Sequence, residues 1–163
     1  MSGWLVANAV LWPVLAPIAT AGLAALFWNF RKTQKAVSCA GTLLTFAAGL
    51  YLLARVDAEG VVAVQFGAWA APFGITFVAD RLAAAMAAIT GLMALATMIF
   101  GAADIRRREE RAGFHPLFHG MLAGVNGAFL TGDIFNLYVW FEIMLITATV
   151  SYTHLTLPTI LLV

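Results

Sequence analysis

The sequence predicts an all-α membrane protein with five transmembrane helices, and two observations support this prediction. Of the 163 residues, 63% are hydrophobic and 10% are charged, with a mean hydropathy of +0.92, whereas a soluble domain is about 25% charged. Most of the chain also falls into apolar runs close to the roughly 20 residues that cross a bilayer. The formal net charge is only +1, so the charge balance predicts no nucleic-acid partner.

The first two runs predict two helices and a small hairpin. Trp4–Trp28 is longer than the core of a signal peptide and has no basic segment before it, which predicts a retained helix. A basic segment, residues 31–35, separates it from the second run, Ala36–Leu53. Between Arg55 and Ala79, two β-prone pieces surround glycines and a proline, which predicts a small β-hairpin outside the membrane.

The remaining runs predict three more helices. Leu82–Ala103 follows Asp80, a residue type that commonly caps a helix N-terminus. Two shorter runs, Phe114–Leu130 and Ile134–Val150, are joined only by residues 131–133. Because the connection is so short, these two helices are expected to be antiparallel neighbours.

The basic residues predict the orientation. Most of them fall in the loops after the first and third helices: Arg31, Lys32, Lys35, Arg106, Arg107, Arg108 and Arg111. The opposite side has only Arg55 and Arg81. Since Lys and Arg in short loops favour the cytoplasmic side, we expect the N-terminus to lie outside.

Glu142 is the main candidate functional residue. It lies nine residues after Asp133, which is roughly 13 Å along a helix and close to the middle of a 30 Å hydrocarbon core. An ionised residue at that depth costs about 2.5–3.5 kcal/mol and usually serves a functional site. Tyr138 and Thr149 share its helical face, so all three are candidates for a proton path. A neutral Glu142 that hydrogen-bonds between helices is the alternative interpretation.

The fourth helix carries a second group of candidates. Three small residues on one face predict close packing against another helix: Gly120, Gly124 and Gly127. For Asn126, in the middle of the helix, we expect a hydrogen bond to a neighbouring helix. His115 and His119 fit equally well a proton relay at the inner end of the helix or two histidines near the lipid headgroups. A metal site is not predicted, because a third ligand is missing and the single Cys39 has no partner.

Three segments resemble a known family: APFGITFVADRL (residues 71–82), LAGVNGAFLTGDIFNLYVWFEIMLI (residues 122–146) and the pair His115-Pro116. They resemble the D subunit of the Mrp-type multisubunit cation/proton antiporters, a relative of the proton-pumping membrane subunits of respiratory complex I. The resemblance implies more than five helices arranged as inverted repeats. It also implies that Glu142 is the essential carboxylate of the proton path and pairs with a lysine on a later helix.

The same resemblance implies the activity and the location. Such complexes exchange sodium or another monovalent cation for protons across the plasma (inner) membrane of bacteria and archaea. They contain several different subunits and no redox cofactor. We therefore expect other antiporter subunits, protons, a monovalent cation and membrane lipid as partners.

The end of the chain departs from the family pattern. Residues 151–158 bring four hydroxylated residues, a histidine and a proline into what should be an apolar helix. They resemble the translated adapter sequence that ends some incomplete gene models. We expect residues 1–150 to be the first five helices of an antiporter-like domain and residues 151–163 to be a non-native tail of a truncated coding sequence, so His154 receives no function.

Two alternative functions remain open. One is a proton-pumping membrane subunit of respiratory complex I, which would make the chain part of an NADH:quinone oxidoreductase instead of a secondary transporter. The other is a five-helix accessory or assembly protein that uses Glu142 and the glycine face only to dock a partner. Dependence of proton movement on NADH and quinone identifies the first alternative, and an effect of Glu142→Gln on assembly instead of transport identifies the second.

Overall fold

The computed structural model of the chain describes residues 8–65, 74–104 and 113–155, with the side chains of 102–104 and 153–155 left aside. Its elements are, in order, η1 (Ala9–Leu11), α2 (Trp12–Leu26), α3 (Arg31–Glu59), β1 (Val62–Gln65), β2 (Thr76–Ala79), α4 (Arg81–Asp104), α6 (Phe114–Phe129) and α7 (Ile134–Leu155). The predicted all-α membrane fold with a small hairpin is confirmed.

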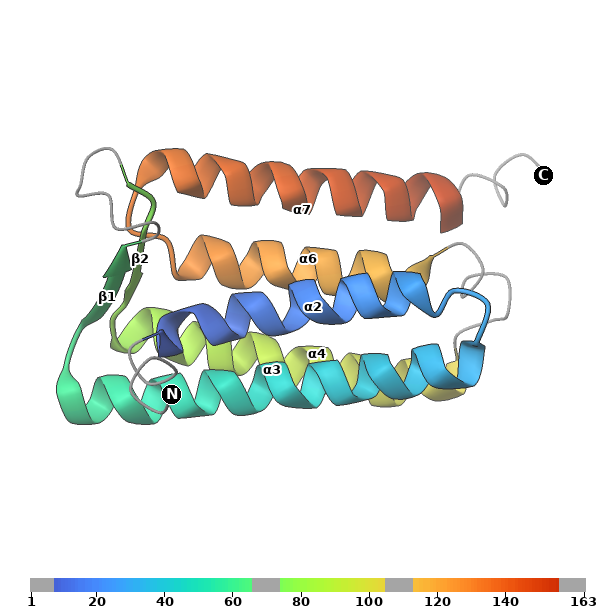
Figure 1. Cartoon of the computed structure of the whole chain (residues 1–163), viewed down its shortest axis with the longest axis horizontal. Helices are drawn as coiled ribbons and strands as arrows, with labels where there is room; N and C mark the ends of the chain where they lie inside the picture. The colour runs from blue at the N-terminus through green and yellow to red at the C-terminus, as the bar shows by residue number, and fades with distance from the viewer. Residues whose placement is uncertain (1–7, 66–73, 105–112, 156–163) are drawn as a thin grey trace.

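Four of the helices enclose a common interior. Helix α2 packs against α3 and α6, and α4 also packs against α3 and α6, so the four helices close into a ring. Helix α7 lies outside this ring and packs on α6 (Figure 1). The predicted antiparallel pairing of the last two helices is confirmed, because α6 and α7 run side by side in opposite directions.

Four described segments are long and apolar enough to cross a membrane: Ala9–Leu26, Arg31–Glu59, Arg81–Gly101 and Ile134–Tyr152. The chain is therefore a multi-pass membrane protein. Helix α6 has only 16 residues, about 24 Å, and lies beside the longer helices (Figure 1). Helix α3 has 29 residues, more than the apolar run predicted, because the charged residues at both of its ends are helical too.

The hairpin end of the bundle is tied together by backbone hydrogen bonds. Strands β1 and β2 are antiparallel, and Val64 faces Phe77 across the pair. The linker between α6 and α7 then pairs with β2: the Val78 amide donates to the Leu130 carbonyl, and the Gly132 amide donates to the Thr76 carbonyl, each at 2.8 Å. These bonds hold the start of α7 against the hairpin.

Two aspartates cap helices at this end. The predicted cap of α4 is present, since Asp80 Oδ1 accepts a hydrogen bond from the Ala83 amide at 2.7 Å. Asp133 accepts one from the Asn136 amide at 2.6 Å through Oδ1 and another from the Thr76 amide at 3.1 Å through Oδ2. The Asp133 carboxylate therefore caps the N-terminus of α7 and connects it to β2.

The apolar core lies at the same end of the bundle. Its buried members come from η1, α2, α3, β2, α4 and α7, together with the residue that follows α6. They are Val10, Leu11, Val14, Leu52, Val56, Phe77, Ala79, Ala84, Ala87, Leu130 and Trp140. The indole of Trp140 meets the ring of Phe77 edge to face at 6.2 Å between centroids. Helix α7 is thus anchored in the core near its first turns.

The predicted boundary at Val150 does not coincide with a helix end. Helix α7 continues through Leu155, five residues further, and residues 156–163 lie outside the described part of the chain. The basic residues 106–111 and the tip of the predicted hairpin also lie outside the described part of the chain. The division into residues 1–150 and a non-native tail stays a prediction.

Candidate functional site

The glycines of α6 determine which face of α7 is buried. Each would bring an added Cβ against a side chain of α7, in this order along the interface: Gly120 against Thr147, Gly124 against Met144 and Gly127 against Trp140. At Gly124 such a Cβ would lie 2.6 Å from Met144 Cγ, closer than carbon atoms approach without overlap. The absence of side chains at these positions therefore lets the two helices touch along this face.

Glu142 lies on the other side of α7. With 100° per residue it is about 160° from both Trp140 and Met144 around the helix axis, and its side chain is half-buried. Tyr138 and Thr149 share this outer face and are exposed. The carboxylate thus faces away from the ring of α2, α3, α4 and α6.

The two histidines lie elsewhere, inside the four-helix ring. His115 is 3% exposed and His119 is 0% exposed. His119 Nε2 is 2.8 Å from Ser38 Oγ of α3, a contact between residues 81 positions apart in the chain. The structure therefore separates His115 and His119 from Glu142, and the predicted candidates form two distinct groups.

Helix α3 contributes polar residues that sequence reasoning missed. Ser38, Thr42 and Thr45 are fully buried and recur at i, i+4 and i+7, the spacing of one helical face. Thr42 and Thr45 donate their hydroxyl protons to carbonyls of their own helix, those of Cys39 and Gly41. Their regular spacing in an otherwise apolar run was the signal that could have identified them.

Asn126 is the third polar residue of α6 in this interior. It is fully buried, and within the described ranges neither its side-chain oxygen nor its side-chain nitrogen has a hydrogen-bond partner. The hydrogen bond to a neighbouring helix that the sequence suggested is thus not formed with these residues. An unpaired buried amide costs about 1–3 kcal/mol, so this residue needs an explanation.

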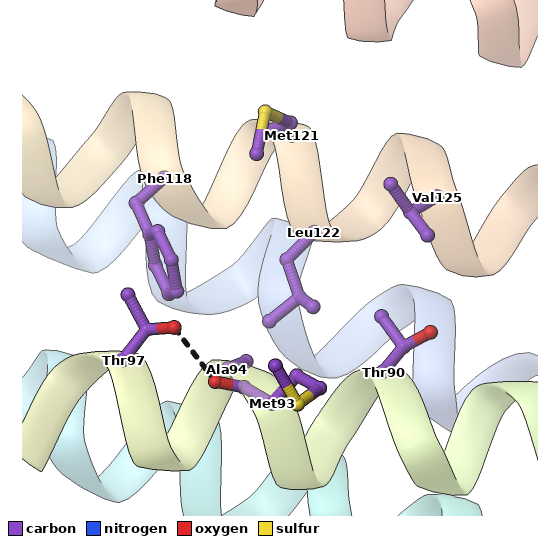
Figure 2. Close-up of a pocket in the computed structure, with 8 residues that line it drawn as sticks. All are labelled: Thr90, Met93, Ala94, Thr97, Phe118, Met121, Leu122 and Val125. Atoms are coloured by element: carbon purple, nitrogen blue, oxygen red, sulfur yellow. Dashed lines mark hydrogen bonds between the residues drawn. The ribbon is translucent and has the colours of Figure 1, made fainter.

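The outer surface carries an apolar groove between α4 and α6. It has a volume of about 160 Å³ and is lined by Thr90, Met93, Ala94, Thr97, Phe118, Met121, Leu122 and Val125 (Figure 2). Its two threonine hydroxyls donate to carbonyls of α4 itself, which leaves an apolar surface suited to lipid chains. Among the residues described, no three His, Cys, Asp or Glu side chains gather as a possible metal site.

These features define a multi-pass membrane protein whose candidate polar residues form two groups, one around Glu142 and one inside the four-helix ring.

Comparison with known proteins shows which proteins the chain is similar to. No protein-family model matches the chain. The D subunit of a Na(+)/H(+) antiporter from Alkalihalophilus pseudofirmus is 36% identical over 86% of this chain and 29% of its own length. The D subunit of a probable K(+)/H(+) antiporter from Rhizobium meliloti is 41% identical over 89% of this chain and 28% of its own length.

Two solved structures are also similar to the chain. A chain of the Mrp complex from Dietzia sp. DQ12-45-1b is 34% identical with a TM-score of 0.76, and the match covers 88% of this chain and 26% of that one. A chain of an archaeal membrane-bound sulfane sulfur reductase has a TM-score of 0.81 at 24% identity, over 87% of this chain and 29% of that chain, which shows a shared fold. The chain is homologous to the D subunits of the cation/proton antiporters and spans less than a third of the relatives it matches.

Proposed function

We propose that this chain is part of a proton-translocating subunit of a multisubunit monovalent cation/proton antiporter in the plasma (inner) membrane of a prokaryote. The support is its homology to antiporter subunits named for sodium and for potassium and its similarity to a chain of an Mrp complex. Since the two named cations differ, the exchanged ion is a monovalent cation of unassigned identity.

The observation that carries the mechanism is the position of Glu142. It lies eight residues into α7, about 12 Å along its axis, and we infer from this length that it sits near the middle of a 30 Å core. Its face of α7 is turned away from α6 and from the ring. In this proposal the half-buried carboxylate holds a proton while no cation is near it and releases the proton when a cation approaches. The cation comes from a segment or partner protein that covers this face of α7.

The orientation is a second part of the proposal. Helix α3 begins with Arg31 and Lys32 at the α2–α3 end of the bundle, whereas Arg55 and Arg81 lie at the hairpin end. The basic α2–α3 end then faces the cytoplasm and the hairpin end lies outside, which places the N-terminus outside. An impermeant amine reagent should label Lys32 in inverted vesicles and not in right-side-out vesicles, and the opposite pattern would reverse the orientation.

The test of the function is Glu142→Gln, with Glu59→Gln as the control. Glu59 is an exposed carboxylate paired with Arg55 at the end of α3. In inverted vesicles that contain the assembled complex, we expect Glu142→Gln to abolish sodium- or potassium-dependent proton movement, while Glu59→Gln preserves it. A native gel must show that both variants assemble.

Each other result would overturn the proposal in a specific way. Retained cation-dependent proton movement in Glu142→Gln would remove the carboxylate from the proton path. Loss of assembly in the same variant would favour an accessory protein that docks through α7. Proton movement that requires NADH and quinone would favour a membrane component of a respiratory complex.

A further inference from the structure

Helices α3 and α6 lie on opposite sides of the four-helix ring, and their buried polar residues lie at matching heights. They run in the same direction (Figure 1), and the contact between Ser38 and His119 fixes their relative height. Applying the same offset of 81 residues places Gln34 level with His115 and Thr45 level with Asn126. The polar residues of one helix thus lie at the heights of the polar residues of the other.

Seven buried side chains make up this feature, which we call the polar column: Gln34, Ser38, Thr42, Thr45, His115, His119 and Asn126. Each is at most 3% exposed. From Gln34 to Thr45 the column extends eleven residues, about 16 Å, which is half of a 30 Å hydrocarbon core. Among the described residues it contains no Lys, Arg, Asp or Glu.

The two ends of the column differ. Gln34 lies at the end of the bundle that carries Arg31 and Lys32, where its side-chain amide donates to the Ala24 carbonyl at 2.8 Å. Beyond Asn126, toward the hairpin, the interior is filled by apolar side chains that are at most 2% exposed: Val10, Val14, Leu52, Val56 and Leu130. The column is therefore polar on the side of the basic residues and closed by the apolar core on the other.

Asn126 occupies the closed end of the column, and its unpaired amide needs hydrogen-bonding partners. It lies within about 40° of His115 and His119 around α6, whereas the glycines that face α7 lie on another side of the helix. Its side chain therefore points into the ring and not toward α7. Buried amides without protein partners are typically satisfied by ordered water, which makes about three hydrogen bonds to polar groups around it.

We propose that the polar column is a water-binding site, hydrated from the end of the bundle with the basic residues and ending at a water bound to Asn126. Thr45 and Thr42 still have free acceptor capacity at their hydroxyl oxygens and lie at the height where that water needs further partners. The His119–Ser38 pair then lies between the bound water and the basic end. Resting on the proposed function, this column gives protons access to half the depth of the membrane on a route separate from Glu142.

Solid-state NMR tests the hydration directly. The chain, labelled with ¹⁵N-asparagine and assembled with its partner proteins in lipid vesicles, contains four asparagines. Asn29 is exposed at the α2–α3 turn and serves as the hydrated reference. Asn136 is buried on α7 outside the column, but its side-chain nitrogen also lacks a partner among the described residues, so its signal is assigned and not used as a reference. The measured quantity is the rate at which proton polarisation passes from water to each side-chain amide, with assignments from Asn126→Leu and Asn136→Leu.

We expect the rate at Asn126 to reach at least half of that at Asn29. A rate at Asn126 below half of the Asn29 rate would overturn the proposal. His119→Leu should also lower water transfer to the Asn126 amide, because His119 lies between Asn126 and the basic end of the bundle, and unchanged transfer would contradict a continuous column. Because this readout does not involve transport, its failure is distinguishable from failure of the Glu142→Gln test.

Discussion

Ser38 Oγ on α3 and His119 Nε2 on α6 are 2.8 Å apart in the middle of the four-helix ring, and both side chains are fully buried. The two helices otherwise touch little, because α2 and α4 lie between them on either side. This hydrogen bond is therefore a specific connection across the ring.

Replacement of Ser38 by Ala should destabilise the protein by about 1–3 kcal/mol, because it leaves a buried imidazole nitrogen without its partner. The control is Thr90→Ala, whose hydroxyl donates to the Met86 carbonyl of its own helix and whose loss should cost less. The free energy of unfolding in a detergent titration measures both. Equal effects of the two substitutions would contradict a special role for the Ser38–His119 pair.

The glycine face of α6 gives a second prediction. Gly127→Ala places a methyl group against the Trp140 indole, so α7 must move outward at a cost of about 1–3 kcal/mol. Gly22→Ala is the matched control, because an added Cβ on α2 meets nothing within 4 Å and should stabilise the helix by about 0.5–1 kcal/mol. Thermal unfolding of the two variants should therefore shift in opposite directions, and a shift in the same direction would be inconsistent with this packing.

The two capping aspartates give a third prediction. Asp133→Ala removes both the cap of α7 and the bond to the Thr76 amide, whereas Asp80→Ala removes one exposed cap bond of α4. A lost cap alone costs about 0.5–2 kcal/mol, so Asp133→Ala should be the more destabilising change. Hydrogen exchange at the Thr76 amide should also accelerate only in Asp133→Ala. Unaltered exchange at Thr76 would show that the carboxylate does not hold β2.

The sequence predicted the helices, the hairpin and the Asp80 cap, because membrane-length apolar runs and turn residues are local signals. It underestimated α3, whose helix includes charged residues at both ends. The apolar run reports only the part inside the hydrocarbon, and a helix of 29 residues is longer than the core is thick. Local composition does not reveal where such a helix stops in water.

The sequence indicated Glu142, His115 and His119 as candidates, but how they group in space was not predictable from it. Whether Glu142 faces α6 or faces away from it depends on which side of α7 meets the glycines, and this is a property of the pair of helices. Likewise, His119 has a hydrogen-bond partner on α3, 81 residues earlier in the chain. Contacts between distant segments leave no mark in the spacing of residues within one helix.

The attachment of α7 has a mechanical consequence. The first turn of the helix is held by the hydrogen bonds of Asp133, and the helix packs against the glycine face of α6. Its second turn is held too, because Trp140 packs in the apolar core. Glu142 lies two residues beyond Trp140, about 3 Å along the helix axis. A 10° tilt of α7 about Trp140, an order-of-magnitude figure, would therefore shift the axis at Glu142 by only about 0.5 Å, so this attachment keeps the carboxylate in place while the far end of α7 moves.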